Sequence, residues 1–209
     1  MSDVPNSAFR PPLLFWDVDT QVDFMLPGGK LYVPGAEQIL PNLQRLTQFA
    51  RRQRIPVVAS TDAHQPDDDE FRQYPPHCLA GTPGQRKVRE TLLDASYIVP
   101  NRPIELLRDL INSRCAQVIV EKQKLDVFTN PNVDDLLKQF GRREIVLYGV
   151  VTELCVRCAA RGLLDRGYRI RLVTDAVRAL DEQKSKEFLE EVKRRGGELV
   201  NTEGVVRPV

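Results

Sequence analysis

Short apolar runs alternate with amphipathic stretches along the chain. Runs of strand length, apolar enough to be covered on both faces, lie at residues 13–18, 55–60, 117–121, 145–148 and 170–173, with a shorter edge-strand candidate at 97–99. Stretches whose apolar residues recur at helical spacing lie at residues 36–54, 104–111, 133–140, 154–166 and 182–195. Strands that alternate with helices need right-handed crossovers, which make the strands parallel. We therefore predict an α/β fold: a doubly wound, mostly parallel β-sheet with helices on both faces.

The chain has 209 residues, close to one ordinary domain, and we expect a single domain over 1–209 with an N-terminal extension at 1–12. Lys and Arg number 30 against 29 Asp and Glu, which gives no basis for a nucleic-acid or anionic-membrane surface. No apolar run approaches the roughly 18 residues of a membrane-spanning helix. The first residues lack the basic start and apolar stretch of a secretory signal. Four cysteines do not make a disulfide framework in a chain of this length, so we expect reduced thiols in the cytoplasm.

Polar residues capable of chemistry follow the predicted strands. They are Asp19 and Asp23, Asp62 and His64, Lys122, residues 149–155, and Asp175. In a parallel sheet, ligands bind at the carboxyl ends of the strands, so these residues are expected at one edge. A long polar loop over 61–87 also starts there, and a loop of that length inside a compact domain is usually functional or disordered.

Cys155 lies where a predicted strand gives way to a helix. The positive end of the helix dipole lowers the pKa of a cysteine in that position and favours the thiolate. The alternative is a small buried residue that packs beneath the sheet. Cys158 completes a CxxC pair, which could serve a redox or zinc-ribbon role, but a second CxxC is absent and we interpret Cys158 as a packing residue. Lys122 and Asp19 have plain alternatives too, as a solvated lysine and as a cap of the following turn.

Asp62, His64 and His77 form a more specific pattern. Asp62 and His64 are two residues apart and project to the same side of an extended chain, and the loop is long enough to bring His77 back to them. This donor set suits one divalent metal ion, most simply zinc, with iron or manganese as alternatives. The competing interpretation is a solvated loop that contains two incidental histidines. Since these are the only histidines of the chain and both lie in one loop, we favour the metal.

Taken together and in this order, the motifs resemble the nicotinamidase branch of the isochorismatase-like cysteine hydrolases. The likeness runs from about residue 13 to 176. The matching segments are Asp19-Thr-Gln-Val-Asp-Phe24, Pro27-Gly-Gly29, Thr61-Asp-Ala-His-Gln-Pro66, Tyr74-Pro-Pro-His-Cys-Leu-Ala-Gly-Thr-Pro-Gly84, Glu121-Lys122 and Gly149-Val-Val-Thr-Glu-Leu-Cys-Val156.

The resemblance implies a triad in which Cys155 is the nucleophile, Asp19 is the general base and acid, and Lys122 is the cation that holds the other two charged, with a lowered pKa at the thiol. It also implies a cis peptide before Val151, whose backbone N–H would form an oxyanion hole with that of Cys155. The implied reaction is nicotinamide plus water to nicotinate plus ammonia, through a thioester. The metal would hold the pyridine nitrogen. We expect the protein to act on a small carboxamide as a homo-oligomer.

Phe24 and Tyr74 are the side chains expected to pack against the substrate ring. The sequence departs from the family's pattern at Ala63 and Tyr74, where tryptophans are usual, at Glu153, where aspartate is usual, and after Lys122, where residues 123–128 replace a serine-containing segment. Two alternatives therefore stay open: an amidase of the same family for another small carboxamide, and a non-catalytic metal-binding or redox module that uses the histidines with Cys155 and Cys158.

Overall fold

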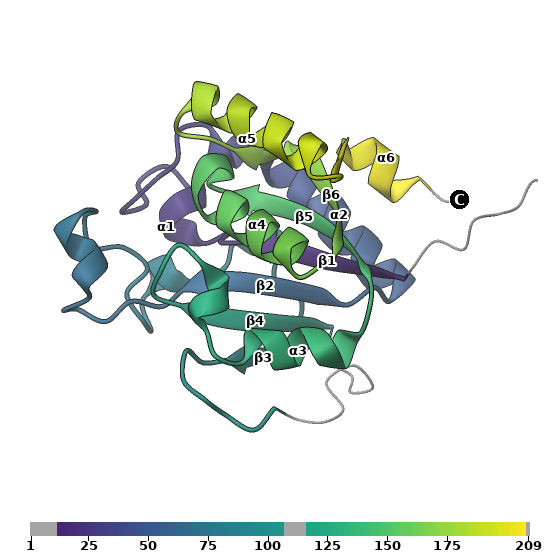
Figure 1. Cartoon of the computed structure of the whole chain (residues 1–209). Helices are drawn as coiled ribbons and strands as arrows, with labels where there is room; N and C mark the ends of the chain where they lie inside the picture. Colours follow the sequence, from purple (N-terminus) through teal and green to yellow (C-terminus); the bar gives the residue numbers. More distant parts are fainter. Residues whose placement is uncertain (1–11, 107–115, 208–209) are drawn as a thin grey trace, which may run out of the picture.

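The computed structural model describes residues 12–106 and 116–207, in which seven strands form one parallel sheet. The strand order is β3-β4-β2-β1-β5-β6-β7 (Figure 1). The strands are β1 Leu13–Val18, β2 Val57–Asp62, β3 Ser96–Val99, β4 Gln117–Lys122, β5 Glu144–Val150, β6 Arg169–Arg178 and β7 Glu198–Val200. The chain leaves β1 toward β2 but leaves β5 toward β6, so the direction of winding reverses between β1 and β5. A sheet that winds in both directions from its centre is doubly wound, as predicted.

Helices cover both faces of the sheet. They are α1 Val22–Met25, α2 Leu40–Gln53, α3 Val133–Phe140, α4 Arg157–Asp165, α5 Glu182–Arg194 and α6 Thr202–Val206. Alternate residues of a strand point to opposite faces. Trp16 of β1 accordingly packs into a core cluster with α3, α4 and α5, whereas Phe15 packs into a second cluster with α2. Figure 1 shows α3, α4 and α5 in front of the sheet and α2 behind it.

Element boundaries differ from the sequence predictions where local pattern and tertiary pairing disagree. The predicted helix over 36–54 is a 3₁₀ turn, Ala36–Ile39, followed by α2, and the predicted helix over 154–166 is a π-helical turn, Thr152–Val156, followed by α4. Strand β6 runs five residues beyond the expected end at Val173 because Val177 and Arg178 pair with β5. Strand β7 and helices α1 and α6 were not predicted, since each is five residues or shorter.

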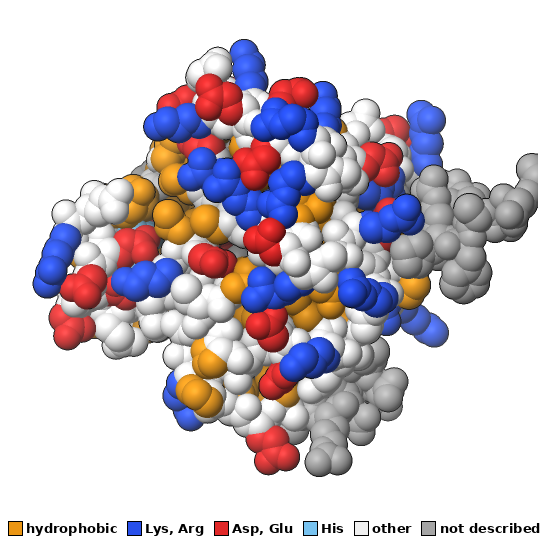
Figure 2. All heavy atoms as spheres, viewed as in Figure 1, with side chains coloured by type: hydrophobic (Ala, Val, Ile, Leu, Met, Phe, Trp, Pro, Cys, Tyr) orange, Lys and Arg blue, Asp and Glu red, His pale blue; other side chains and the backbone are white. Residues whose placement is uncertain are grey.

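Two predictions fall outside the described residues. The helix expected over 104–111 lies largely in 107–115, and the N-terminal extension at 1–12 lies almost wholly in 1–11. Among the residues that are described, no helix is both long and apolar enough to cross a membrane. Figure 2 shows Lys and Arg side chains interleaved with Asp and Glu side chains on the face that α4 and α5 cover, in keeping with a net charge of +1.

Candidate active site

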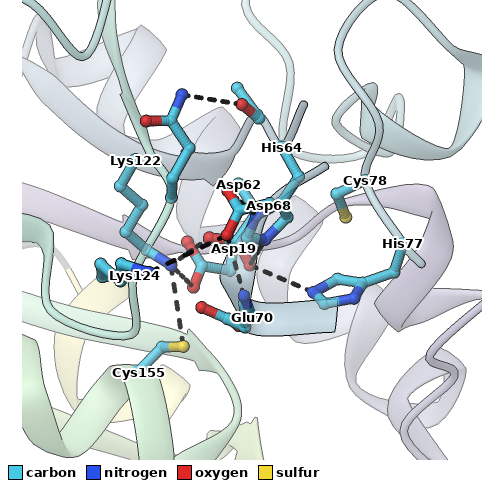
Figure 3. A network of polar contacts seen from close by, with 12 residues as sticks. Asp19, Asp62, His64, Asp68, Glu70, His77, Cys78, Lys122, Lys124 and Cys155 are labelled. Atoms are coloured by element: carbon cyan, nitrogen blue, oxygen red, sulfur yellow. Dashed lines mark hydrogen bonds and ion pairs between the residues drawn. The ribbon is translucent and has the colours of Figure 1, made fainter. Parts of the chain in front are cut away.

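The carboxyl ends of four neighbouring strands bring the predicted site residues together. Asp19 follows β1, Asp62 ends β2, Lys122 ends β4, and Cys155 lies in the π-helical turn after β5. Figure 3 shows these four side chains directed toward one another. Asp19, Asp62 and Cys155 line one pocket at this edge, which also contains His77, Phe24 and Tyr74.

Lys122 is the centre of the polar network. Its side chain is 1% exposed, and its Nζ atom lies 2.9 Å from Asp19 Oδ2 and 3.8 Å from Cys155 Sγ and donates to Asp62 Oδ1 (Figure 3). Burial acts to lower the pKa of Lys122, but the Asp19 and Asp62 carboxylates outweigh it and hold that pKa well above its usual value. Lys122 is therefore a buried ammonium ion near neutral pH.

Ser60 of β2 fixes both the backbone and the side chain of Asp19. Its φ angle is +51°, its backbone N–H donates to Ser60 O at 3.1 Å, and the Ser60 hydroxyl donates to Asp19 Oδ1 at 2.6 Å. Burial raises the pKa of the Asp19 carboxyl, Lys122 opposes that shift, and the neighbouring Asp62 charge adds to it. A carboxyl group with a raised pKa can accept a proton and keep it for a later transfer.

Cys155 corrects one expectation from the sequence. The helical turn and the ammonium group were expected to lower the pKa of its thiol. Burial instead raises that pKa well above its usual value; Lys122 lowers it, and the nearby Asp19 and Asp62 raise it further. The side chain is 6% exposed, so desolvation of the thiolate dominates. Burial in this arrangement therefore favours the thiol over the thiolate.

Asp62, His64 and His77 converge on one point from β2 and the loop after it. One ligand atom from each lies within 4.8 Å of the others, and all three residues are buried. The Nε2 atoms of both histidines lie 3.8 Å from Asp62 Oδ2. The buried His64 Nε2 atom has no hydrogen-bond partner. An unpartnered buried ring nitrogen facing an ionised carboxylate fits a metal ligand, because a bound cation would satisfy it.

The far side of each histidine ring is fixed as well. His64 Nδ1 lies 3.0 Å from Asp68 Oδ2, and His77 Nδ1 donates to the Pro75 carbonyl oxygen at 2.8 Å. A hydrogen bond at Nδ1 leaves Nε2 free to bind a metal and orients the ring, as outer partners do in metal sites. Asp68 was not predicted, because in the run Pro66-Asp-Asp-Asp69 it is indistinguishable from a solvated acidic residue.

Gln21, within the first matched motif, positions the backbone of Asp62, one of the candidate metal ligands. Its Oε1 atom accepts the Asp62 backbone N–H at 2.7 Å, and its Nε2 atom donates to Asp62 O at 2.8 Å and to Gln85 O at 2.7 Å. This pairing joins β1, β2 and the loop in one unit. The motif contained the signal, but the sequence alone gave Gln21 no role.

Asp23 fixes the segment that contains His77. Its Oδ2 atom accepts the Cys78 backbone N–H at 2.7 Å, and its Oδ1 atom accepts the Lys30 N–H at 3.0 Å. The same carboxylate packs against Gly84, where an added Cβ would lie 2.2 Å from Asp23 Oδ2. The polar loop over 61–87 is therefore anchored against α1, which explains how so long a segment can position a ligand.

The walls of the pocket are aromatic and aliphatic. The ring of Phe24 lies 5.3 Å from that of His77, and the ring of Tyr74 lies 6.5 Å from it. The other side chains that line it are Leu31, Val33, Glu70, Leu125, Val150, Val151, Leu154 and Leu180. Most of these come from loops distant in sequence and gave no periodic signal. The peptide bond between Val150 and Val151 is cis, as the resemblance implied.

The fold and this site define the protein as a member of a hydrolase family: the Isochorismatase domain model matches residues 13–204, so the chain belongs to the isochorismatase family. It is similar to a nicotinamidase of Escherichia coli, 25% identical over 186 residues, which cover 83% of this chain and 86% of that enzyme. A maleamate amidohydrolase of Pseudomonas putida is 23% identical over 198 residues, which cover 95% of this chain and 86% of that enzyme. Among solved structures, a pyrazinamidase of Pyrococcus horikoshii in complex with zinc is 28% identical, with a TM-score of 0.74 over 91% of this chain and 99% of that one.

Proposed function

We propose that the protein is a metal-containing cysteine amidohydrolase that converts nicotinamide and water to nicotinate and ammonia. The observation that supports this best is the buried Lys122 ammonium, in contact with Asp19 and Asp62 and 3.8 Å from Cys155 Sγ. It joins a nucleophile and its base to a candidate metal cluster within one pocket. The similarity to a nicotinamidase and to a zinc-containing pyrazinamidase agrees with both parts.

The triad accounts for each proton transfer. As Cys155 Sγ attacks the amide carbon, Asp19 takes the thiol proton, and Lys122 stabilises the negative charge that develops on sulfur. Asp19 then delivers that proton to the departing ammonia, which leaves a thioester. A water molecule that loses a proton to Asp19 attacks the thioester, the carbon–sulfur bond breaks to release the acid, and Asp19 returns the proton to the Cys155 sulfur, which restores the thiol. The N–H groups of Val151 and Cys155 are the proposed donors to the carbonyl oxygen.

A divalent cation would be held by Asp62, His64 and His77, beside the triad. When bound, it supplies a Lewis acid that can hold a ring nitrogen of the substrate. Phe24 and Tyr74, next to His77, are proposed to pack against that ring. Zinc is the proposed ion, with iron or manganese as alternatives. Cytoplasmic location and assembly as a homo-oligomer stay predictions.

The pocket walls favour a neutral amide over an anionic one. Among the described residues that line the pocket, none is a lysine or arginine, whereas three are the acidic residues Asp19, Asp62 and Glu70. A carboxylate on the substrate would be buried beside apolar walls and three acidic side chains, where only the proposed metal ion could offset its charge, and this is costly. Nicotinamide has no such group, but maleamate has one.

Ammonia release across a panel of carboxamides tests the substrate. We expect kcat/KM for nicotinamide to exceed that for maleamate by at least about 100-fold, because a substrate carboxylate beside Asp19, Asp62 and Glu70 is rejected in the transition state as well. Pyrazinamide, another neutral heteroaromatic amide, is the positive comparison. A preference for maleamate, or for an aliphatic amide over both aromatic ones, would refute the nicotinamide assignment and support the alternative amidase.

Removal of a metal ligand tests the second half of the proposal. His64→Ala and His77→Ala should each lower bound divalent metal to well below one ion per chain and raise KM for nicotinamide, because each removes one of three protein ligands. Asp68→Asn should weaken metal affinity by about 10–100-fold while it leaves the ligands in place. Elemental analysis and metal titration give the readout. Wild-type protein that contains no divalent metal and takes none up would show that the cluster is structural.

The role of Cys158 distinguishes the proposed hydrolase from the alternative redox module. It lies on α4, outside the residues that line the pocket, and is only partly buried. A redox pair needs both thiols, whereas the proposed hydrolase needs Cys155 alone.

A further inference from the structure

Glu153 connects the turn that contains Cys155 to another part of the chain. Its side chain is 3% exposed, and its Oε1 atom accepts two backbone N–H groups, from Leu180 at 3.0 Å and from Asp181 at 2.7 Å. Both donors belong to the short segment between β6 and α5. Hydrogen bonds from two adjacent N–H groups to one buried acidic side chain are among the stronger protein hydrogen bonds.

The segment that Glu153 holds forms part of the pocket mouth. Leu180 lines the pocket, yet it remains 53% exposed, so it lies between the pocket and solvent. Asp181 in turn caps α5, because its Oδ1 atom accepts the backbone N–H groups of Gln183 and Lys184, both at 3.0 Å. The position of Leu180 is therefore defined by α5 on one side and by Glu153 on the other.

The geometry points to Glu153 as a positioning residue that holds Leu180 at the pocket mouth and so limits the width of molecules that reach Cys155. Glu153 itself does not line the pocket. It acts through Leu180: without the two hydrogen bonds, the segment between β6 and α5 loses its direct link to the turn that contains Cys155, and the mouth widens. This inference goes beyond the proposed function, since it concerns access to the thiol and does not depend on which amide is the substrate.

Alkylation of Cys155 by a narrow and a wide reagent tests this directly. The rates with iodoacetamide and with N-phenyl iodoacetamide are measured at the Cys155 peptide by mass spectrometry, which separates it from the other cysteines. Glu153→Ala should raise the ratio of the alkylation rate with N-phenyl iodoacetamide to the rate with iodoacetamide at least about fivefold, because both hydrogen bonds are lost. Leu180→Ala should raise this ratio similarly. The ratio for the double variant should not exceed the larger of the two single-variant ratios, because both changes act on the same contact.

Two controls distinguish a positioning role of Glu153 from a general loosening of the structure, and a third variant serves as a substitute. Glu153→Gln keeps an oxygen acceptor and should stay within about twofold of the wild-type ratio. Glu187→Ala removes an exposed glutamate from α5 and should leave the ratio unchanged. If Glu153→Ala does not fold, Glu153→Asp, which shortens the side chain by one methylene, takes its place and should raise the ratio too.

Two results would overturn the inference: a wild-type ratio in the folded Glu153 variant, or additive effects of Glu153→Ala and Leu180→Ala. Failure of the nicotinamide assignment would leave the alkylation ratios as expected, so the two proposals fail separately. Where nicotinamide is hydrolysed, Glu153→Ala should raise its KM more than it lowers kcat, because the thiol and its partners stay in place.

Discussion

Cys155→Ala should abolish amide hydrolysis, with a loss of at least about 10⁴-fold in kcat, while the protein keeps its fold. The sulfur is the only nucleophile in the proposed mechanism, and no other thiol lines the pocket among the described residues. Alanine removes one buried atom next to β5 and leaves the backbone of the turn unchanged. Ammonia release measures the activity, and thermal unfolding measures the fold.

Cys158→Ala is the matched control, because it removes the same atom three residues further along the chain. It should retain substantial activity if the protein is a hydrolase. Near-normal turnover by Cys155→Ala would remove the nucleophile from the mechanism. Wild-type protein that releases no ammonia from any carboxamide would favour the non-catalytic metal-binding or redox module.

Lys122→Met should lower kcat/KM by about 10²–10⁴-fold and also destabilise the protein. Methionine fills most of the same space but removes the ammonium from between Asp19 and Asp62, so two carboxylates are left facing each other in a buried site. The loss of one partner of a buried ion pair costs about 3–5 kcal/mol of unfolding free energy. Steady-state kinetics and denaturant unfolding give the two readouts.

The pH dependence of alkylation at Cys155 gives the sign of the electrostatic effect. Lys122 lowers the pKa of the Cys155 thiol, against the larger effect of burial. Its removal should therefore shift the alkylation profile to higher pH. Asp19→Asn combined with Lys122→Met should be scarcely slower in turnover than the poorer single variant, since the groups act together.

Lys124→Met is the control for Lys122→Met. Lys124 is half-exposed and lies 3.9 Å from Asp68, outside the triad. Its replacement should leave both turnover and the alkylation profile near those of the wild type. A Lys122→Met enzyme that turns over normally, beside an inactive Lys124→Met enzyme, would show that the wrong lysine was assigned.

The central strands could be read from the sequence because burial on both faces makes them continuous apolar runs. Strands β1, β4 and β5 were expected within a residue or two of their observed bounds. Strand β7 could not be found in the same way, because three residues give no pattern and its pairing with β6 depends on the whole sheet. The same holds for α1, whose four residues are helical in the context of the loop packed against it.

The charge states at the site could not be read from residue order. A cysteine at the start of a helical turn, near a lysine, predicts a lowered pKa, but burial in the folded protein raises the pKa of the Cys155 thiol. Desolvation decides the outcome, and desolvation depends on how much of the chain covers the sulfur. The raised pKa of Asp19 has the same origin.

The sequence by itself determined which reactive side chains stand at the strand ends, because a parallel sheet aligns those ends at one edge. It also predicted the candidate metal-ligand set, since both histidines lie in the loop that follows one strand and Asp62 lies two residues before His64. Only the tertiary structure decided what surrounds them: Leu31, Leu125 and Leu180 reach the pocket from separate loops. It alone also decided that Glu153 holds the mouth segment, because that contact joins residues 27 and 28 positions apart and no local pattern encodes a contact across such a separation.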